Sequence, residues 1–243
     1  MSTFAAMASG NDSSAAKSGS FVTLKQSDGS DFRAFVAGPP DARAAVLIVH
    51  DYFGISDATK AAVKHLGALG YRSLAVDLYG DKSATSHQEA AKLMQSLDRK
   101  ASDQILQGGL DYLKQLGRKL ATIGFSMGGQ ESLNANLNDP EAVSATLMIY
   151  GSGFDKIGTK RLERLTSPVL VITGGEDAGA TPAAINFLSK MKEAKRPYEM
   201  LIYPGADHGY AQPLFNEGKN YNPEAVHTTW VLIDDFLDSH LKH

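Results

Sequence analysis

Short apolar runs of strand length alternate with longer segments of helical periodicity along most of this chain. Six runs are expected to be buried strands, at residues 45–50, 73–76, 120–124, 145–150, 169–173 and 198–203. Helices are expected at about residues 57–69, 86–97, 103–116, 128–137, 182–194 and 223–241. This alternation is typical of α/β proteins, in which a mostly parallel central sheet carries helices on both faces.

The N-terminal part of the chain departs from this alternation. Residues 1–20 are rich in Ser, Ala, Gly and Asn, and we expect a disordered tail there. Two β-prone runs, residues 21–25 and 31–36, are joined by the turn-forming sequence Ser27-Asp-Gly-Ser30, which predicts an antiparallel hairpin. Since no repeat or linker follows, residues 21–243 are expected to form one domain.

Composition excludes several classes of function. The chain has no cysteine, so disulfides, thiolate zinc sites and a cysteine nucleophile are absent. The net charge is -3 and the basic residues are scattered, which argues against nucleic-acid binding. The apolar runs are far shorter than the roughly 20 residues that span a bilayer. Without a recognisable targeting segment, a cytoplasmic location is the default expectation, and an exported protein whose signal segment has been trimmed is the alternative.

The strongest local motif is Gly124-Phe-Ser126-Met-Gly128, which lies between an expected strand and an expected helix. This is the context of a nucleophile elbow, a tight turn that projects a serine hydroxyl from strained backbone. Glycines are needed at positions 124 and 128 because a Cβ there would crowd the backbone. The backbone N–H of Met127, at the start of the helix, is suited to hold a developing oxyanion.

A serine hydroxyl needs a base and an orienting carboxylate, expected in the chain order Ser, acid, His. His208 is the predicted base, because it is the one histidine in a loop just after a late strand. Asp177 is the predicted acid, since it follows the run 169–173 at the strand end where α/β sheets collect active groups. Glu176 is the alternative acid, and Asp207 is expected to be an exposed loop residue.

The chain resembles the dienelactone hydrolases in four blocks that occur in the same order. The blocks are Val49-His-Asp-Tyr-Phe-Gly54, Val76-Asp-Leu-Tyr-Gly80, Gly124-Phe-Ser-Met-Gly-Gly129, and His208-Gly-Tyr210 preceded by Asp177. The likeness extends from about residue 21 to residue 241 and implies an α/β-hydrolase fold. It also implies a second oxyanion donor, the backbone N–H of Tyr52. Asp51 stands where the family usually has a glutamate that interacts with the nucleophile, although capping of its own loop explains Asp51 equally well.

Two departures from the family bear on the chemistry. Dienelactone hydrolases use a cysteine nucleophile, whereas this chain has Ser126, which requires general-base help from His208. The family also holds the substrate carboxylate with two arginines, and the corresponding positions here are Asp81 and Gln212. An acid at position 81 would repel a carboxylate, so we expect a neutral ester or lactone as the substrate.

The predicted protein is therefore a serine hydrolase that cleaves a small-molecule carboxylic ester or lactone through an acyl-enzyme. No metal or other cofactor is expected. The pair Gly108-Gly109 does not predict a phosphate-binding loop, since it lies inside a helical run and follows no strand. The chain is expected to be a monomer or a small homo-oligomer. Two alternatives stay open: a peptidase or amidase with the same triad, and a non-catalytic binding protein with this fold.

Overall fold

The computed structural model describes residues 18–115 and 118–242. Eight strands form one sheet in the order β1-β2-β4-β3-β5-β6-β7-β8. The strands are β1 (Ser20–Lys25), β2 (Asp31–Ala37), β3 (Ala44–Val49), β4 (Arg72–Val76), β5 (Lys119–Phe125), β6 (Val143–Ile149), β7 (Val169–Gly174) and β8 (Tyr198–Tyr203). The predicted α/β architecture is confirmed, and each expected strand is present within two residues of its expected limits. The expectation that residues 198–203 form a buried strand is wrong, because β8 is the edge strand of the sheet and its residues are exposed or partly buried.

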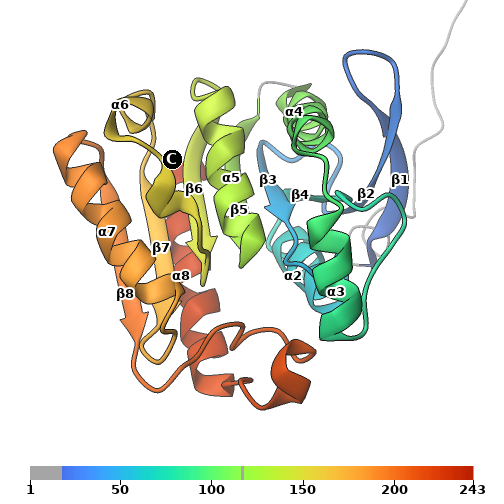
Figure 1. Cartoon of the computed structure of the whole chain (residues 1–243). Coiled ribbons are helices and arrows are strands. Elements are labelled where there is room, and N and C mark those ends of the chain that lie inside the picture. The colour runs from blue at the N-terminus through green and yellow to red at the C-terminus, as the bar shows by residue number, and fades with distance from the viewer. Residues whose placement is uncertain (1–17, 116–117, 243) are drawn as a thin grey trace, which may run out of the picture.

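The pairing of the strands separates an antiparallel edge from a parallel body. β1 pairs antiparallel with β2, and β2 pairs antiparallel with β4, which confirms the N-terminal hairpin. All pairs from β4 through β3 and on to β8 are parallel. The carboxyl ends of the parallel strands therefore lie at one edge of the sheet, the lower edge in Figure 1.

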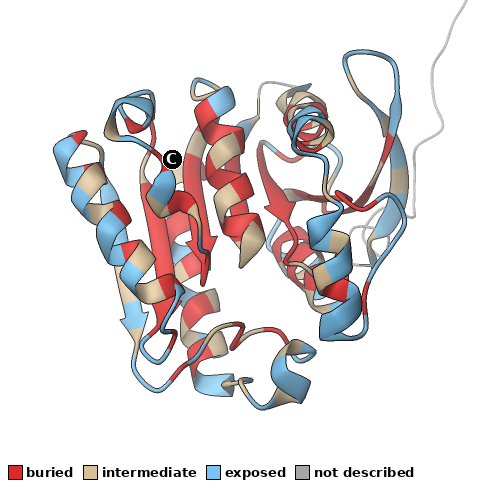
Figure 2. Ribbon diagram, viewed as in Figure 1, coloured by how far each residue is buried: buried red, intermediate tan, exposed pale blue. Residues whose placement is uncertain are grey.

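Helices cover both faces of the sheet (Figure 1). One face packs against α2 (Asp57–Ala68) and α8 (Pro223–Leu241), and the other packs against α4 (Arg99–Lys114), α5 (Met127–Asn138) and α7 (Ala180–Glu193). The shorter helices are α3 (His87–Gln95), α6 (Thr159–Leu162) and the 3-10 turns η2 (Phe154–Lys156) and η3 (Phe215–Gly218). Figure 2 shows the central strands almost wholly buried between these layers, whereas the helices expose their outer sides.

Close packing explains the paired glycines of α4. A Cβ at Gly108 would meet the ring of Phe32 at 2.8 Å, and one at Gly109 would meet side chains of β3 and β4 at the same distance. These glycines therefore bring the helix close to the sheet.

Several expectations need correction. α4 starts at Arg99, four residues earlier than expected, because the Asp98 side chain caps it by accepting from the N–H of Ala101. The elements α6, η2 and η3 have no counterpart among the expected helices, since they are too short to show periodicity. Of the expected tail 1–20, residues 1–17 lie outside the described part, but Ser20 already belongs to β1.

Trp230, on α8, is partly buried and packs against the margin of the core. Within residues 18–115 and 118–242, no helix combines the length and hydropathy needed to cross a membrane.

Candidate active site

The turn between β5 and α5 has the geometry of a nucleophile elbow. Ser126 has φ 53° and ψ −118°, a strained combination for a residue with a Cβ. A Cβ at Gly124 would lie 1.8 Å from the carbonyl oxygen of Gly128, and one at Gly128 would lie 2.3 Å from that of Val49. Glycine at both positions thus lets the turn close beneath the serine.

The structure brings the three predicted catalytic side chains into one hydrogen-bonded chain. Ser126 Oγ lies 2.9 Å from His208 Nε2. His208 Nδ1 lies 2.6 Å from Asp177 Oδ2. Because an ionised carboxylate can only accept, Nδ1 carries the proton and Nε2 is free to accept the serine proton. The arrangement suits nucleophilic attack by Ser126.

Asp177 lies in a loop between β7 and α7, where it is 4% exposed. Its Oδ1 accepts from the backbone N–H of Gly179 at 3.0 Å and of Ala180 at 2.7 Å, at the start of α7. Burial opposes ionisation, but the hydrogen bonds from His208 and from these two N–H groups outweigh it and lower the pKa of Asp177. Asp177 is therefore an anion at neutral pH.

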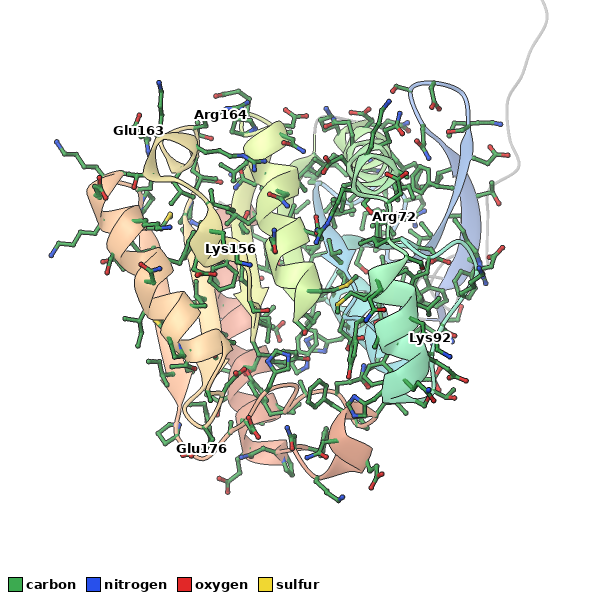
Figure 3. The ribbon with its side chains drawn as sticks, in the orientation of Figure 1. Arg72, Lys92, Lys156, Glu163, Arg164 and Glu176 are labelled. Carbon is green, nitrogen blue, oxygen red and sulfur yellow. The ribbon has the colours of Figure 1, made fainter. Side chains whose placement is uncertain are left out.

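The two other carboxylates considered for this role face elsewhere. Glu176 is exposed on the loop after β7, at the carboxyl edge of the sheet, as Figure 3 shows. Asp207 Oδ1 accepts from the backbone N–H of His208 at 2.6 Å. Of the three candidates, the structure places only Asp177 against the His208 imidazole.

The two expected oxyanion donors follow the neighbouring strands β3 and β5. Met127 is the first residue of α5, and Tyr52 lies in the loop between β3 and α2. Neither backbone N–H has an acceptor recorded within residues 18–115 and 118–242. Buried His50 steadies the loop of Tyr52: its Nδ1 donates to the carbonyl of Asp51 at 2.5 Å, and its Nε2 accepts from the N–H of Leu78 at 3.2 Å.

Asp51 caps its own loop in the structure. Its Oδ1 accepts from the N–H of Phe53 at 2.8 Å, and its Oδ2 accepts from Gln212 Nε2 at 2.6 Å. No contact with Ser126 is recorded among the described residues. Burial raises the pKa of Asp51, against hydrogen bonds from Gln212 and Phe53 that lower it. Of the two interpretations of Asp51, the loop cap is the one that the structure displays.

A cavity of about 280 Å³ opens beside this cluster. Its lining comes from α2, from α8, from the loop after His208 and from the carboxyl edge of the sheet. The walls are largely aliphatic and aromatic, and they include Ala58, Ala62, Phe125, Val226 and Trp230. No arginine or lysine is among the described residues that line it.

Gln212 and Asp81 occupy different places relative to this cavity. Gln212 lines it and binds Asp51. Asp81 pairs with Arg33 and lines a separate surface hollow near β1 and β2. The expectation that Asp81 repels a substrate carboxylate is therefore corrected, because its charge is paired and lies outside the cavity. The lack of arginine and lysine among the described lining residues still agrees with the expectation of an uncharged substrate.

Sequence reasoning did not identify the residues that hold His208 in place. Its ring lies between two aromatic rings, Tyr150 at 5.7 Å and Phe215 at 5.1 Å between centroids. Asn220 Nδ2 donates to its carbonyl oxygen at 2.8 Å. Tyr150 was assigned only as the end of a strand. No sequence signal distinguishes Phe215 or Asn220 from other loop residues, since their contacts depend on how the loop folds back.

The fold and this cluster define an α/β-hydrolase. The model of the dienelactone hydrolase family matches residues 32–241, which is most of the chain. The chain belongs to the dienelactone hydrolase family, and it is an enzyme of that hydrolase type.

Individual relatives agree with this assignment. A protein of Saccharolobus solfataricus is 25% identical over 252 residues, covering 87% of this chain and 95% of its own length. The carboxymethylenebutenolidase of Pseudomonas putida is 23% identical over 204 residues, covering 79% and 85%. The crystal structure of a dienelactone hydrolase-like promiscuous phosphotriesterase from metagenomic libraries has a TM-score of 0.78 at 21% identity, covering 92% and 99%.

The fold also occurs in a peptidase. The acylaminoacyl peptidase of Pyrococcus horikoshii has a TM-score of 0.69 at 15% identity, covering 92% of this chain and 42% of that one. This likeness concerns the fold alone.

Proposed function

We propose that this protein hydrolyses an uncharged carboxylic ester or lactone through an acyl-enzyme on Ser126. The observation that carries the proposal is the hydrogen-bonded chain from Ser126 through His208 to Asp177, with distances of 2.9 and 2.6 Å. Such a chain at the carboxyl edge of this fold has the geometry that acyl transfer requires.

In the first half of the reaction Ser126 Oγ attacks the substrate carbonyl carbon. His208 Nε2 takes the serine proton, and Asp177 stabilises the imidazolium that forms. The oxyanion lies between the backbone N–H groups of Tyr52 and Met127. Collapse of the tetrahedral intermediate breaks the bond to the alcohol oxygen, which receives the proton from His208. In a lactone this oxygen stays attached to the acyl group.

Water completes the cycle. His208 takes a proton from a water molecule, whose oxygen attacks the acyl carbon in the same oxyanion site. The intermediate then collapses, the bond to Ser126 Oγ breaks, and His208 returns the proton to the serine. A free carboxylic acid and the unmodified enzyme result.

The charge of the lining supports an uncharged substrate. The carboxylate of Asp51 contributes to the cavity wall, and His65, the one imidazole among the described lining residues, interacts with Asp234 at 3.0 Å. A substrate carboxylate entering the cavity would be desolvated without a basic partner from the described residues. Neutral esters avoid this cost.

The test is the hydrolysis of p-nitrophenyl acetate and p-nitrophenyl octanoate by the protein and by two variants, Ser126→Ala and His208→Ala. Each variant should lose roughly 10⁴ to 10⁶ in kcat, because removing either partner disables the whole unit. Turnover that persists in both variants contradicts the proposed roles. An unmodified protein inactive on esters, lactones and amides alike would favour a non-catalytic binding function.

A further inference from the structure

The cavity beside the triad has walls suited to a small apolar group. α2 contributes the small side chains Ala58, Ala61 and Ala62, and α8 contributes Val226 and Trp230. Its volume of about 280 Å³ lies at the lower end of the range of small-ligand sites. The basic side chains labelled in Figure 3 lie on separate elements elsewhere in the molecule, and none of them lines the cavity.

The cavity adjoins the catalytic centre through Tyr150. The Tyr150 side chain lines the cavity, and its ring also packs edge-on against His208, with 5.7 Å between centroids. Phe125, which lines the same wall, directly precedes Ser126 in the chain. The cavity therefore borders the catalytic centre through these two residues.

Tyr150 is a buried polar side chain with unused hydrogen-bonding capacity. The residue is 2% exposed, and its hydroxyl has no hydrogen-bond partner among residues 18–115 and 118–242. Burial, with the nearby charge of Asp51, raises the pKa of Tyr150 well above its usual value. The hydroxyl thus stays protonated and is available as a donor. The oxygen is open to the cavity, unlike the buried unpartnered atoms Asn136 Oδ1 and Arg196 Nε, so water can reach it there. An acceptor atom of a ligand that enters the cavity can replace that water.

The backbone of Tyr150 is also strained. Its φ is 38°, in the left-handed region that β-branched and bulky residues rarely adopt. Strain of this kind costs about 1–3 kcal/mol and concentrates at functional sites. Its N–H donates to the carbonyl of Ile172 at 2.7 Å, which fixes the position from which the ring projects.

From these observations we infer that the cavity between α2 and α8 is a specificity subsite. It takes the apolar, uncharged part of the substrate, and the Tyr150 hydroxyl donates a hydrogen bond to an acceptor oxygen on that part. The inference rests on the proposed ester hydrolysis but assigns residues that the reaction itself does not require.

Binding can be measured independently of catalysis, because the single tryptophan of the chain, Trp230, lines the cavity. Tryptophan fluorescence is titrated with cyclohexanone and with methylenecyclohexane, which match in shape but differ in the acceptor oxygen. Cyclohexanone should bind about 2- to 10-fold more tightly, the worth of one net hydrogen bond. Tyr150→Phe should remove this preference. An equal preference in both proteins, or no saturable change with either ligand, overturns the inference.

A second experiment tests whether the group that fills the cavity is part of the ester substrate. Ala61→Phe fills the mouth of the cavity from an exposed helix position, and Ala68→Phe is the matched control on the same helix outside the lining. Two ratios of kcat/KM are measured. The first compares p-nitrophenyl octanoate with p-nitrophenyl acetate, which differ in the acid part, and the second compares hexyl acetate with methyl acetate, which differ in the alcohol part. Ala61→Phe should lower one of these ratios roughly tenfold or more, because in an apolar pocket the fit of even one methylene group changes kcat/KM by about that factor.

The outcomes separate the two claims. If the Ala61→Phe and Ala68→Phe variants share the ratios of the unmodified protein, the subsite is contradicted while ester hydrolysis stands. If no ester is hydrolysed by the unmodified protein, the proposed function fails, and the fluorescence titration still decides whether the cavity binds an uncharged apolar ligand. The ester series that responds tells whether the group belongs to the acid or to the alcohol.

Discussion

At the scale of single residues, the protonation of the candidate site is set by single hydrogen bonds, because each ring nitrogen of His208 has one partner. His208 Nδ1 meets Asp177 and its Nε2 meets Ser126, so the tautomer is set by one carboxylate. Sequence reasoning reached these three residues because each is tied to a motif or to the end of a strand. It could not reach Tyr150, whose distinguishing features are a backbone angle and an unused hydroxyl.

Asp177→Asn should reduce kcat by roughly 10³ to 10⁴ while the protein stays folded. The amide can keep the acceptor for the N–H groups of Gly179 and Ala180, but its NH₂ group would face His208 Nδ1 and favour the wrong tautomer. Ester turnover and thermal unfolding measure the two effects.

Glu176→Gln is the matched control, since Glu176 is an exposed neighbouring carboxylate. It should retain turnover within about twofold. If Glu176→Gln were the more damaging change, the assignment of the orienting acid would be wrong.

At the scale of elements, the site is assembled where β5, β7 and β8 end. Central strands such as β3 and β7 were located because buried parallel strands are continuous apolar runs. Helix limits were less accurate, as α4 shows, since a capping side chain such as Asp98 fixes a boundary that periodicity does not mark. The loop that brings Phe215 onto His208 depends on contacts between segments far apart in the chain, which local sequence patterns do not encode.

Gly128→Ala should destabilise the protein by about 2–4 kcal/mol and reduce turnover, because the new Cβ would meet two backbone carbonyls of β3 and its loop. Urea unfolding monitored by circular dichroism gives the change in free energy.

Gly158→Ala is the comparison, since a Cβ at Gly158 would enter open space and its φ is −74°. It should change stability by less than about 0.5 kcal/mol. Equal stability of the two variants would contradict the close approach of β5, α5 and β3 at the elbow.

The packing of α8 gives a second prediction at this scale. Leu237 is fully buried against the sheet, whereas Val231 on the same helix is 52% exposed. Leu237→Ala should cost about 2–5 kcal/mol of unfolding free energy. Val231→Ala should cost about 0.5 kcal/mol or less. Similar costs for the two variants would mean that α8 does not pack on the sheet through this face.

At the scale of the whole molecule, two buried carboxyl groups change the stability with pH in opposite directions. The pKa of Asp177 is lowered in the folded protein, and that of Asp51 is raised. The hydrogen bonds of Asp177 lower its folded-state pKa, so its contribution is present above the unfolded pKa and is lost as pH falls. Burial raises the pKa of Asp51, so its favourable contribution is present at low pH and is lost as pH rises through the folded-state pKa.

The stability of Asp51→Asn relative to the unmodified protein should therefore increase as the pH rises from 4 toward neutral, by about 2–4 °C in Tm for each kcal/mol of ionisation cost relieved. The amide cannot ionise and keeps an acceptor for the N–H of Phe53, but its NH₂ group faces Gln212 Nε2, so the loss of that hydrogen bond lowers the Tm by an amount that does not change with pH. The Tm of Asp51→Asn minus that of the unmodified protein should fall as the pH is lowered toward 4. A difference that grows on acidification would show that the carboxylate of Asp51 is stabilised by the fold.

The central claim is that Ser126, activated by His208, is the nucleophile of this hydrolase. The most direct measurement is the reaction of the protein with a p-nitrophenyl alkylphosphonate, followed by intact mass and peptide mapping. We expect one adduct per chain, located on Ser126, absent in Ser126→Ala and formed roughly 10³-fold or more slowly in His208→Ala. An adduct on another residue, or labelling at the same rate without His208, would contradict the claim.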